Sequence, residues 1–188
     1  YLDIFSPRES KFVNPLLDLL RDNYDDTYEY GLAHIRLHRS TSKWPLRTPD
    51  LNYREFCNLH YLKFILPCFN SNVLLNVLQK CHKLQLLIIQ SNKEGPSPSR
   101  TWEPQSTIVP KCLKSHLNHI HIEGYQGFED ELAFAEYILR NGLVLKTMLI
   151  FVDTSMDLTN KHRSLERLTH IPKGSVTCQL KLDAAVSP

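Results

Sequence analysis

The chain has 188 residues, which is enough for one sizeable hydrophobic core or for one core shared by stacked units. Its composition, 42% hydrophobic and 22% charged with a formal net charge of +2, is that of an ordinary soluble protein and gives no general attraction to nucleic acid or anionic membranes. No apolar run approaches the roughly 18 residues of a membrane-spanning helix, and the start at Tyr1 lacks the layout of a signal peptide, so we expect a soluble fragment or processed chain.

Residues 1–58 give the weakest signals of secondary structure. Asn14 followed by Pro15 opens the segment PLLDLLRD and predicts a short helix, because proline is tolerated at the first helical position. The segment LAHIRL then predicts a strand with Leu32, Ile35 and Leu37 as its core residues. A polar loop that contains proline, STSKWPLRTPDLN, follows this strand.

The pattern of LAHIRL, with apolar residues at positions i, i+3 and i+5, recurs along the chain. It returns in LHYLKF, LQLLII, LNHIHI and LKTMLI, and successive copies begin 27, 25, 33 and 28 residues apart. A weaker sixth copy, TCQLKL, carries Leu180 and Leu182. The spacing is the strand signature of leucine-rich repeats, although a βαβ protein could also give apolar strands at such intervals.

Three amphipathic segments alternate with these strands and predict helices. We expect SNVLLNVLQKCHK to start at Ser71 or Asn72, and FEDELAFAEYILRNG to end at its Asn-Gly pair after an acidic first turn. We expect DLTNKHRSLERLTHIP to run from Thr159 or Asn160 to a stop near Pro172. The alternation predicts an α/β fold, a curved leucine-rich-repeat-like stack of strand–helix units with parallel strands.

The proline-rich loop across residues 91–108 is long and polar, and it predicts a boundary between units. Trp102 lies in this loop and Trp44 in the earlier one. A tryptophan in such a place either clamps its loop onto the core or stands exposed as an anchor for a partner. The clamp is the favoured interpretation for both.

The segment from residue 109 to residue 182 resembles the FBD domain that ends many plant F-box/leucine-rich-repeat proteins. The resemblance rests on five separated motifs: Val109-Pro110-Lys111-Cys112-Leu113, Gly124-Tyr125-Gln126-Gly127, Glu131-Leu132, Asn141 through Ile150, and Pro172 to Cys178. It predicts an irregular leucine-rich-repeat-like region over residues 1–108, an FBD domain of similar strand–helix units over residues 109–183, and a tail over residues 184–188.

The resemblance implies a function as well as a fold. Members of this family resemble the substrate receptors of cullin-type ubiquitin ligases, in which an F-box docks on a Skp-type adaptor and the repeats hold the protein to be ubiquitinated. We find no F-box in these residues, so the Skp-type adaptor and the cullin are expected as partners only through an F-box outside the chain. The expected partner of the chain itself is an unidentified target protein, and neither membrane nor nucleic acid is expected.

The histidines of KSHLNHIHIEGY could be metal ligands or surface residues of a strand. Cys112, His116, His119 and His121 together suggest a zinc site, because imidazole and thiolate are zinc ligands. In the repeat frame, however, His119 and His121 are outward neighbours on one strand, while a structural zinc site needs four converging ligands. A strand surface that faces solvent or a partner is the favoured interpretation, with no metal and no cofactor.

The sequence contains no recognisable catalytic motif, whether a nucleophile elbow, a phosphate-binding glycine loop or a paired-carboxylate motif, and we expect no enzyme activity. The five cysteines are odd in number and scattered, so reduced thiols and an intracellular location, in nucleus or cytoplasm, are expected.

Function is expected on the outward strand residues, because parallel strands of repeat stacks line a surface that commonly binds partners. The predicted partner-binding residues are His34, Arg36, Tyr61, Lys63, Gln85, His119, His121 and Thr147. Their basic, histidine-rich character predicts an acidic or mixed-charge protein surface as the partner, with some dependence on pH. The alternative is a repeat scaffold that senses a small molecule or an anion.

Overall fold

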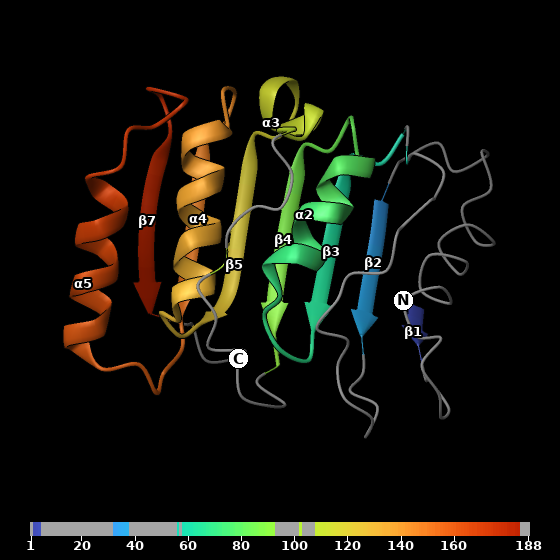
Figure 1. Ribbon diagram of the computed structural model, residues 1–188. Coiled ribbons are helices and arrows are strands. Elements are labelled where there is room, and N and C mark those ends of the chain that lie inside the picture. The colour runs from blue at the N-terminus through green and yellow to red at the C-terminus, as the bar shows by residue number, and fades with distance from the viewer. Residues whose placement is uncertain are drawn as a thin grey trace.

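The structure is a computed structural model, which describes residues 2–4, 32–37, 56, 58–92, 102 and 108–184. In these residues, seven strands form one sheet in which every neighbouring pair is parallel and the strands follow one another in sequence order (Figure 1). The strands are β1 (Leu2–Ile4), β2 (Leu32–Leu37), β3 (Tyr61–Leu66), β4 (Leu86–Ser91), β5 (His119–Tyr125), β6 (Thr147–Val152) and β7 (Gln179–Ala184). The helices are α2 (Ser71–Lys80), α3 (Lys111–Ser115), α4 (Glu129–Asn141) and α5 (Leu158–Thr169).

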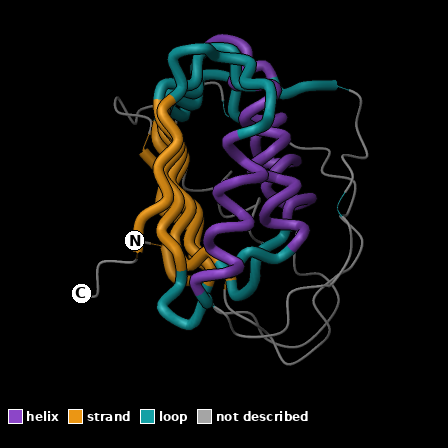
Figure 2. Tube along the Cα trace, turned by 90° about the vertical axis from the view of Figure 1, so that its left-hand side faces the viewer, coloured by secondary structure: helices purple, strands orange, loops and turns teal. Residues whose placement is uncertain are grey.

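The described helices all cover the same face of the sheet, and none of the described elements lies on the opposite face (Figure 2). Sequential parallel strands with helices on one face are the arrangement of stacked strand–helix repeats. The predicted α/β class, with leucine-rich-repeat-like units and parallel strands, is confirmed.

The repeat template explains the core of β3, β4, β5 and β6. In each of these four copies, the residues at i, i+3 and i+5 are no more than 3% exposed. The i+3 residues also lie in register from strand to strand: Leu62 pairs with Leu87, Leu87 with Ile120, and Ile120 with Met148. Burial of each such side chain contributes roughly 1.5–3 kcal/mol to the stability of the fold. The buried residues of successive units form one continuous core.

The first copy of the template is displaced by two residues, which corrects the prediction for Leu32. Leu32 pairs with Tyr61 instead of serving as the leading core residue, and its side chain is 65% exposed. Register is set by pairing with the neighbouring strand, which the hexamer pattern does not contain. A shift of two residues preserves the alternation of the strand, so His34 stays in register with Lys63, and Arg36 with Ile65.

Among the described elements, sequence reasoning missed two. β1 is only three residues long, and its signal is the alternation of Leu2, Asp3 and Ile4, which is too short for the template. Helix α3 is too short to show a helical period, although it buries Cys112 and Leu113. The helix expected after Asn14 lies outside the described residues.

The predicted helices differ from the observed ones mainly at their first residues. Helix α4 has the predicted bounds. Helix α5 starts at Leu158, before the predicted Thr159 or Asn160, because Asp157 serves as its N-cap, and it ends at Thr169. Helix α2 starts at Ser71 but takes Asn70 as its N-cap, whose Oδ1 accepts a hydrogen bond from the Val73 amide at 3.1 Å. Caps of this kind supply acceptors for amides that have no partner inside the helix.

The loop across residues 91–108 does not separate two cores, because β4 pairs directly with β5. Trp102 Nε1 donates to Asn72 Oδ1 at 2.7 Å, and its ring packs against Phe134 and Tyr137 with centroids 5.8 and 5.6 Å away. The clamp interpretation of Trp102 is confirmed, whereas Trp44 lies outside the described residues. The division of the chain into two domains at residue 108 stays a prediction, and the hydrophobic core is continuous across this position.

Candidate functional site

The open side of the sheet presents three rows of outward side chains, which we call the sheet face. The first row is Tyr61, Leu86, His119, Thr147 and Gln179; the second is Lys63, Ile88, His121, Leu149 and Lys181; the third is Ile65, Gln90, Glu123, Phe151 and Asp183. Neighbouring strands lie about 4.8 Å apart, so residues of one row stand side by side.

The structure brings five of the predicted partner-binding residues together on this face. Tyr61, His119 and Thr147 belong to the first row, and Lys63 and His121 to the second. Gln85 is exposed but lies one residue before β4, at the border of the face. His34 and Arg36 have only their backbone in the described part, and their side chains lie outside it.

Side chains on the sheet face also contact one another. His119 Nδ1 lies 3.2 Å from Thr147 Oγ1, and the ring of His121 meets that of Phe151 edge-on at 6.3 Å. Lys63 Nζ lies 3.5 Å from Glu123 Oε2 and so bridges two strand spacings across β4. These contacts fix side chains that lie beside apolar residues of β4 and β6.

The third row was missed because each strand continues beyond the six-residue template. The signal was the same alternation carried two residues further, which reaches Ile65, Glu123 and Phe151. These residues change the net charge and the apolar content of the sheet face. Lys63 and Lys181 are matched there by Glu123 and Asp183, so the described face is charge-balanced and rich in apolar groups.

The pKa of His121 is lowered, chiefly because the ring is partly buried. Nearby Glu123 opposes this effect, and His119 adds to it. A histidine whose pKa is lowered is neutral at pH 7, so its ring acts at this pH as a hydrogen-bonding and packing group.

The residues of the zinc hypothesis do not converge. Cys112 is buried in α3, where its Sγ donates to the Leu78 carbonyl at 3.4 Å, and burial raises the pKa of the thiol to about 12. His119 and His121 lie on the sheet face. Across the part of the chain that the structure describes, no group of three or more histidine, cysteine or acidic side chains is placed to hold a metal ion.

The turn from β5 to α4 is built around a buried carboxylate. Glu131 Oε2 accepts hydrogen bonds from three successive amides, those of Gln126, Gly127 and Phe128, at 2.9, 2.8 and 3.1 Å. Gly124 and Gly127 both have positive φ, at 74° and 79°. Burial raises the pKa of Glu131 to about 7, while the hydrogen bonds from the three amides oppose that rise.

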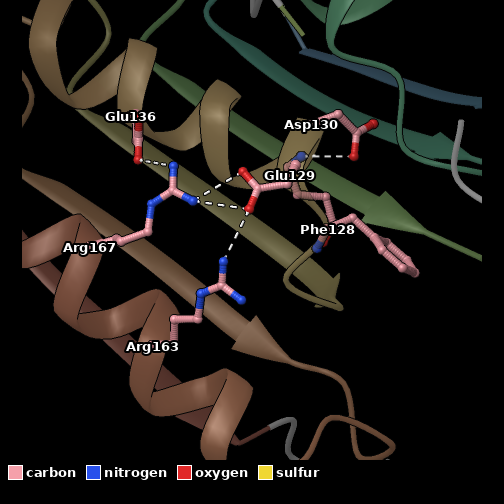
Figure 3. A network of polar contacts seen from close by, with 7 residues as sticks. Phe128, Glu129, Asp130, Glu136, Arg163 and Arg167 are labelled. Carbon is pink, nitrogen blue, oxygen red and sulfur yellow. Dashed lines mark hydrogen bonds and ion pairs between the residues drawn. The ribbon is translucent and has the colours of Figure 1, made fainter. Parts of the chain in front are cut away.

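Ion pairs hold α5 against α4 (Figure 3). Arg167 places Nη1 3.0 Å from Glu129 Oε2 and Nη2 3.0 Å from Glu136 Oε1, and Arg163 Nη2 lies 3.7 Å from Glu129 Oε1. Glu129 thus serves two arginines at the start of α4, where an acidic side chain also complements the helix dipole.

This geometry defines a class of protein: a stack of strand–helix repeats with one open sheet face, the form that repeat proteins use to bind partners. Comparison with known proteins agrees with this class. Residues 105–150 match the family model of the FBD domain.

The chain is similar to proteins of a plant, Arabidopsis thaliana. It is 32% identical over 114 residues to an F-box/FBD/LRR-repeat protein of Arabidopsis thaliana, a match that covers 60% of this chain and 26% of the relative. It is 35% identical over 185 residues to an FBD-associated F-box protein of the same plant, covering 92% of this chain and 41% of the relative. The chain therefore spans well under half the length of these relatives.

The chain is an FBD-containing relative of the plant F-box/FBD/LRR-repeat proteins, and the resemblance seen in its motifs is confirmed. No solved structure matches it. None of the described helices combines the length and the apolar character needed to cross a membrane.

Proposed function

We propose that this chain is the non-catalytic target-recognition part of an F-box-type substrate receptor for a cullin-based ubiquitin ligase. Its relatives carry F-box in their names, which supports a place in this system. A Skp-type adaptor and a cullin join through an F-box outside the 188 residues. The site of action is inside the cell, in the nucleus or the cytoplasm, where such ligases work.

The observation that carries the proposal is the sheet face. It presents apolar side chains of β4 and β6 that no other element covers in the described part of the chain, next to the His121–Phe151 ring pair and the Lys63–Glu123 ion pair. Protein interfaces combine an apolar centre with a polar surround and are enriched in aromatic residues. The target that fits is a protein surface with apolar groups at its centre and charges of both signs around them.

A double variant of the ring pair, His121→Ser with Phe151→Ser, tests the sheet face. The matched control is Lys161→Ser with Glu166→Ser, two substitutions on α5, which lies on the opposite side of the sheet. Full-length protein is used to capture targets under proteasome inhibition, and the affinity of each purified target is then measured directly. We expect the face variant to weaken binding at least tenfold, about 1.4 kcal/mol, and the control to leave it unchanged.

Equal binding by both variants would remove the sheet face as the target site. Capture of the Skp-type adaptor serves as the internal control, because neither variant touches an F-box. Retention of a small anion by the chain, with no protein target, would favour the alternative of a sensing scaffold.

A further inference from the structure

The charged residues of the turns are segregated between the two ends of the strands. We call the described turns and helix ends that lead into β3–β7 the strand-start rim, and those that follow β3–β6 the strand-end rim. Within residues 58–60, 80–85, 110–118, 140–146 and 170–178, the strand-start rim holds seven lysines and arginines and no acidic residue. Within residues 67–70, 92, 126–131 and 153–157, the strand-end rim holds five acidic residues and no lysine or arginine.

The helix dipole gives a physical reason for this pattern. Acidic side chains are favoured at the start of a helix and basic ones at its end, by roughly 0.3–1 kcal/mol each. In this stack α2, α4 and α5 all run antiparallel to the strands (Figure 1). The helix starts, which favour acidic residues, therefore all lie where the strands end, and the helix ends, which favour basic residues, all lie where the strands start.

The two rims differ in what their charges do. At the strand-end rim, Asp157 caps α5, Glu131 holds the turn before α4, and Glu129 pairs with two arginines. At the strand-start rim, none of the seven cations forms an ion pair with a described residue. Lys83 and Lys173 donate only to neutral acceptors, the side-chain oxygen of Asn58 and the carbonyl of Cys178.

The cations of the strand-start rim lie on one connected surface. The Lys146 amide donates to the Asn118 carbonyl at 2.7 Å, the Asn118 amide to the Gln85 carbonyl at 2.9 Å, and the Leu143 amide to the Leu113 carbonyl at 2.9 Å. These bonds join the turns before β4, β5 and β6, with α3 among them (Figure 1). Five of the cations are exposed: Lys83, Lys111, Lys114, Arg140 and Lys146.

Apolar and aromatic content decides which polyanion fits this rim. Leu143, between Arg140 and Lys146, is 54% exposed, and Val176 in the next turn is 96% exposed. The five counted ranges of the rim contain no phenylalanine, tyrosine or tryptophan, which are platforms on which single-stranded nucleic acids stack their bases. Cations that form no ion pair with a described residue, beside exposed aliphatic groups, match a polypeptide better than a nucleic acid.

We propose that the strand-start rim binds an acidic polypeptide segment that carries aliphatic side chains. The segment lies across the turns before β4, β5 and β6, its carboxylates pair with the exposed lysines and Arg140, and its aliphatic groups contact Leu143. This surface adjoins the sheet face but contains none of the residues of its three rows, so binding here does not rest on the proposed receptor function.

The experiment measures fluorescence anisotropy of a labelled peptide of glutamates interspersed with leucines, added to the complete chain. A peptide with glutamine in place of glutamate is the ligand control. The rim variant is Lys114→Glu with Lys146→Glu, and the matched control is Lys161→Glu with Lys181→Glu, which changes the net charge equally away from the rim. Circular dichroism verifies that both variants are folded.

We expect the rim variant to weaken binding of the glutamate peptide at least tenfold and the matched control less than twofold. Binding should fall as salt shortens the Debye length from about 10 Å at 0.1 M to about 3 Å at 1 M. The sheet-face variant, His121→Ser with Phe151→Ser, should bind the peptide unchanged, which separates this result from any failure of the receptor proposal.

Three outcomes would overturn the proposal. Equal losses in the rim variant and its control would show attraction to net charge alone. Equal binding of the glutamine peptide would show that carboxylates are not recognised. Tighter binding of oligothymidine than of the peptide would assign the rim to nucleic acid.

Discussion

The two ends of the strands use the same helix electrostatics for different purposes. At the strand-end rim, the acidic groups are bound within the fold: Glu131 accepts from three amides at one oxygen, and Asp157 accepts from the Asn160 amide at 2.7 Å. At the strand-start rim, Lys114 and Lys146 are exposed and form no ion pair within the described residues. The acidic groups of the strand-end rim therefore stabilise the fold, whereas the basic groups of the strand-start rim are accessible to a partner. Substitutions at the two ends should separate these roles.

The largest effect is expected at Gly124, which lies in β5 one residue before the strand ends and next to the strand-end rim. Gly124→Ala adds a Cβ that would lie 2.9 Å from the Ser91 carbonyl oxygen, at a backbone φ of +74°. Strain at positive φ and the contact with rigid backbone should together lower the free energy of unfolding by about 2–4 kcal/mol. Urea denaturation followed by circular dichroism measures this loss.

Gly127→Ala is the control for Gly124. It has φ of +79°, but its added Cβ would meet the flexible end of Met156 at 2.6 Å. The side chain can move aside, so we expect a smaller loss, about 1–2 kcal/mol. A larger loss at Gly127 than at Gly124 would show that the contact with Ser91 is not the limiting one.

The next effect is expected at Glu131, and it depends on pH. Glu131→Ala leaves three amides without their acceptor and should cost about 1–3 kcal/mol. The pKa of Glu131 in the fold is raised to about 7 from its ordinary value of 4.5, so the folded state holds this proton more tightly than the unfolded state does. This contribution to stability is complete below the unfolded pKa and is lost as pH rises through the folded one.

Unfolding free energies of the native chain and of Glu131→Gln, measured from about pH 4 to about pH 8, check this sign. The native chain should lose on the order of 3 kcal/mol relative to the glutamine variant as pH rises across that window. Parallel curves for the two proteins would contradict the raised pKa.

A smaller effect is expected at the start of α5. Asp157→Ala removes the acceptor of the Asn160 amide and should lower the free energy of unfolding by about 1 kcal/mol. Asp157→Asn retains a capping oxygen and should lose less, because asparagine caps about as well as aspartate. Equal losses would mean that the charge of Asp157 matters more than its hydrogen bond.

The smallest effect is expected at the strand-start rim. Lys114→Ala and Lys146→Ala should each change the free energy of unfolding by no more than about 0.5 kcal/mol, since both side chains are exposed and have no ionic partner in the described part of the chain. Thermal unfolding checks this. A loss comparable with that at Asp157 would remove the contrast between the two rims.

Local patterns were sufficient to predict much of the fold. The template residues from Leu59 to Ile150 marked four strands correctly, because residues at i+3 and i+5 of a strand share one face whatever the neighbours are. Helix α4 was predicted with its bounds, because its acidic first turn and its Asn-Gly stop are local signals. The same template failed at Leu32, where pairing with β3 and not the hexamer determined which residues enter the core.

The candidate site was predictable only in part. Tyr61, His119 and His121 follow from alternation along their strands, and the structure places them on the sheet face. Glu123 and Phe151 were missed because their strands continue past the template, and their presence makes the face charge-balanced and more apolar. The sequence alone could not exclude Cys112 as a zinc ligand beside the histidines, because only the packing of α3 against α2 buries its thiol.

The sequence by itself determined which residues form strands and helices, which side chains alternate inward, and that the chain carries the motifs of an FBD domain. Each of these properties depends on residues within a few positions of one another. The tertiary structure alone decided the register of β2, the convergence of three amides on Glu131, and the union of separate turns into a basic rim and an acidic rim. Those features depend on pairing between segments that are distant in the chain, and pairing follows from the energy of the assembled stack.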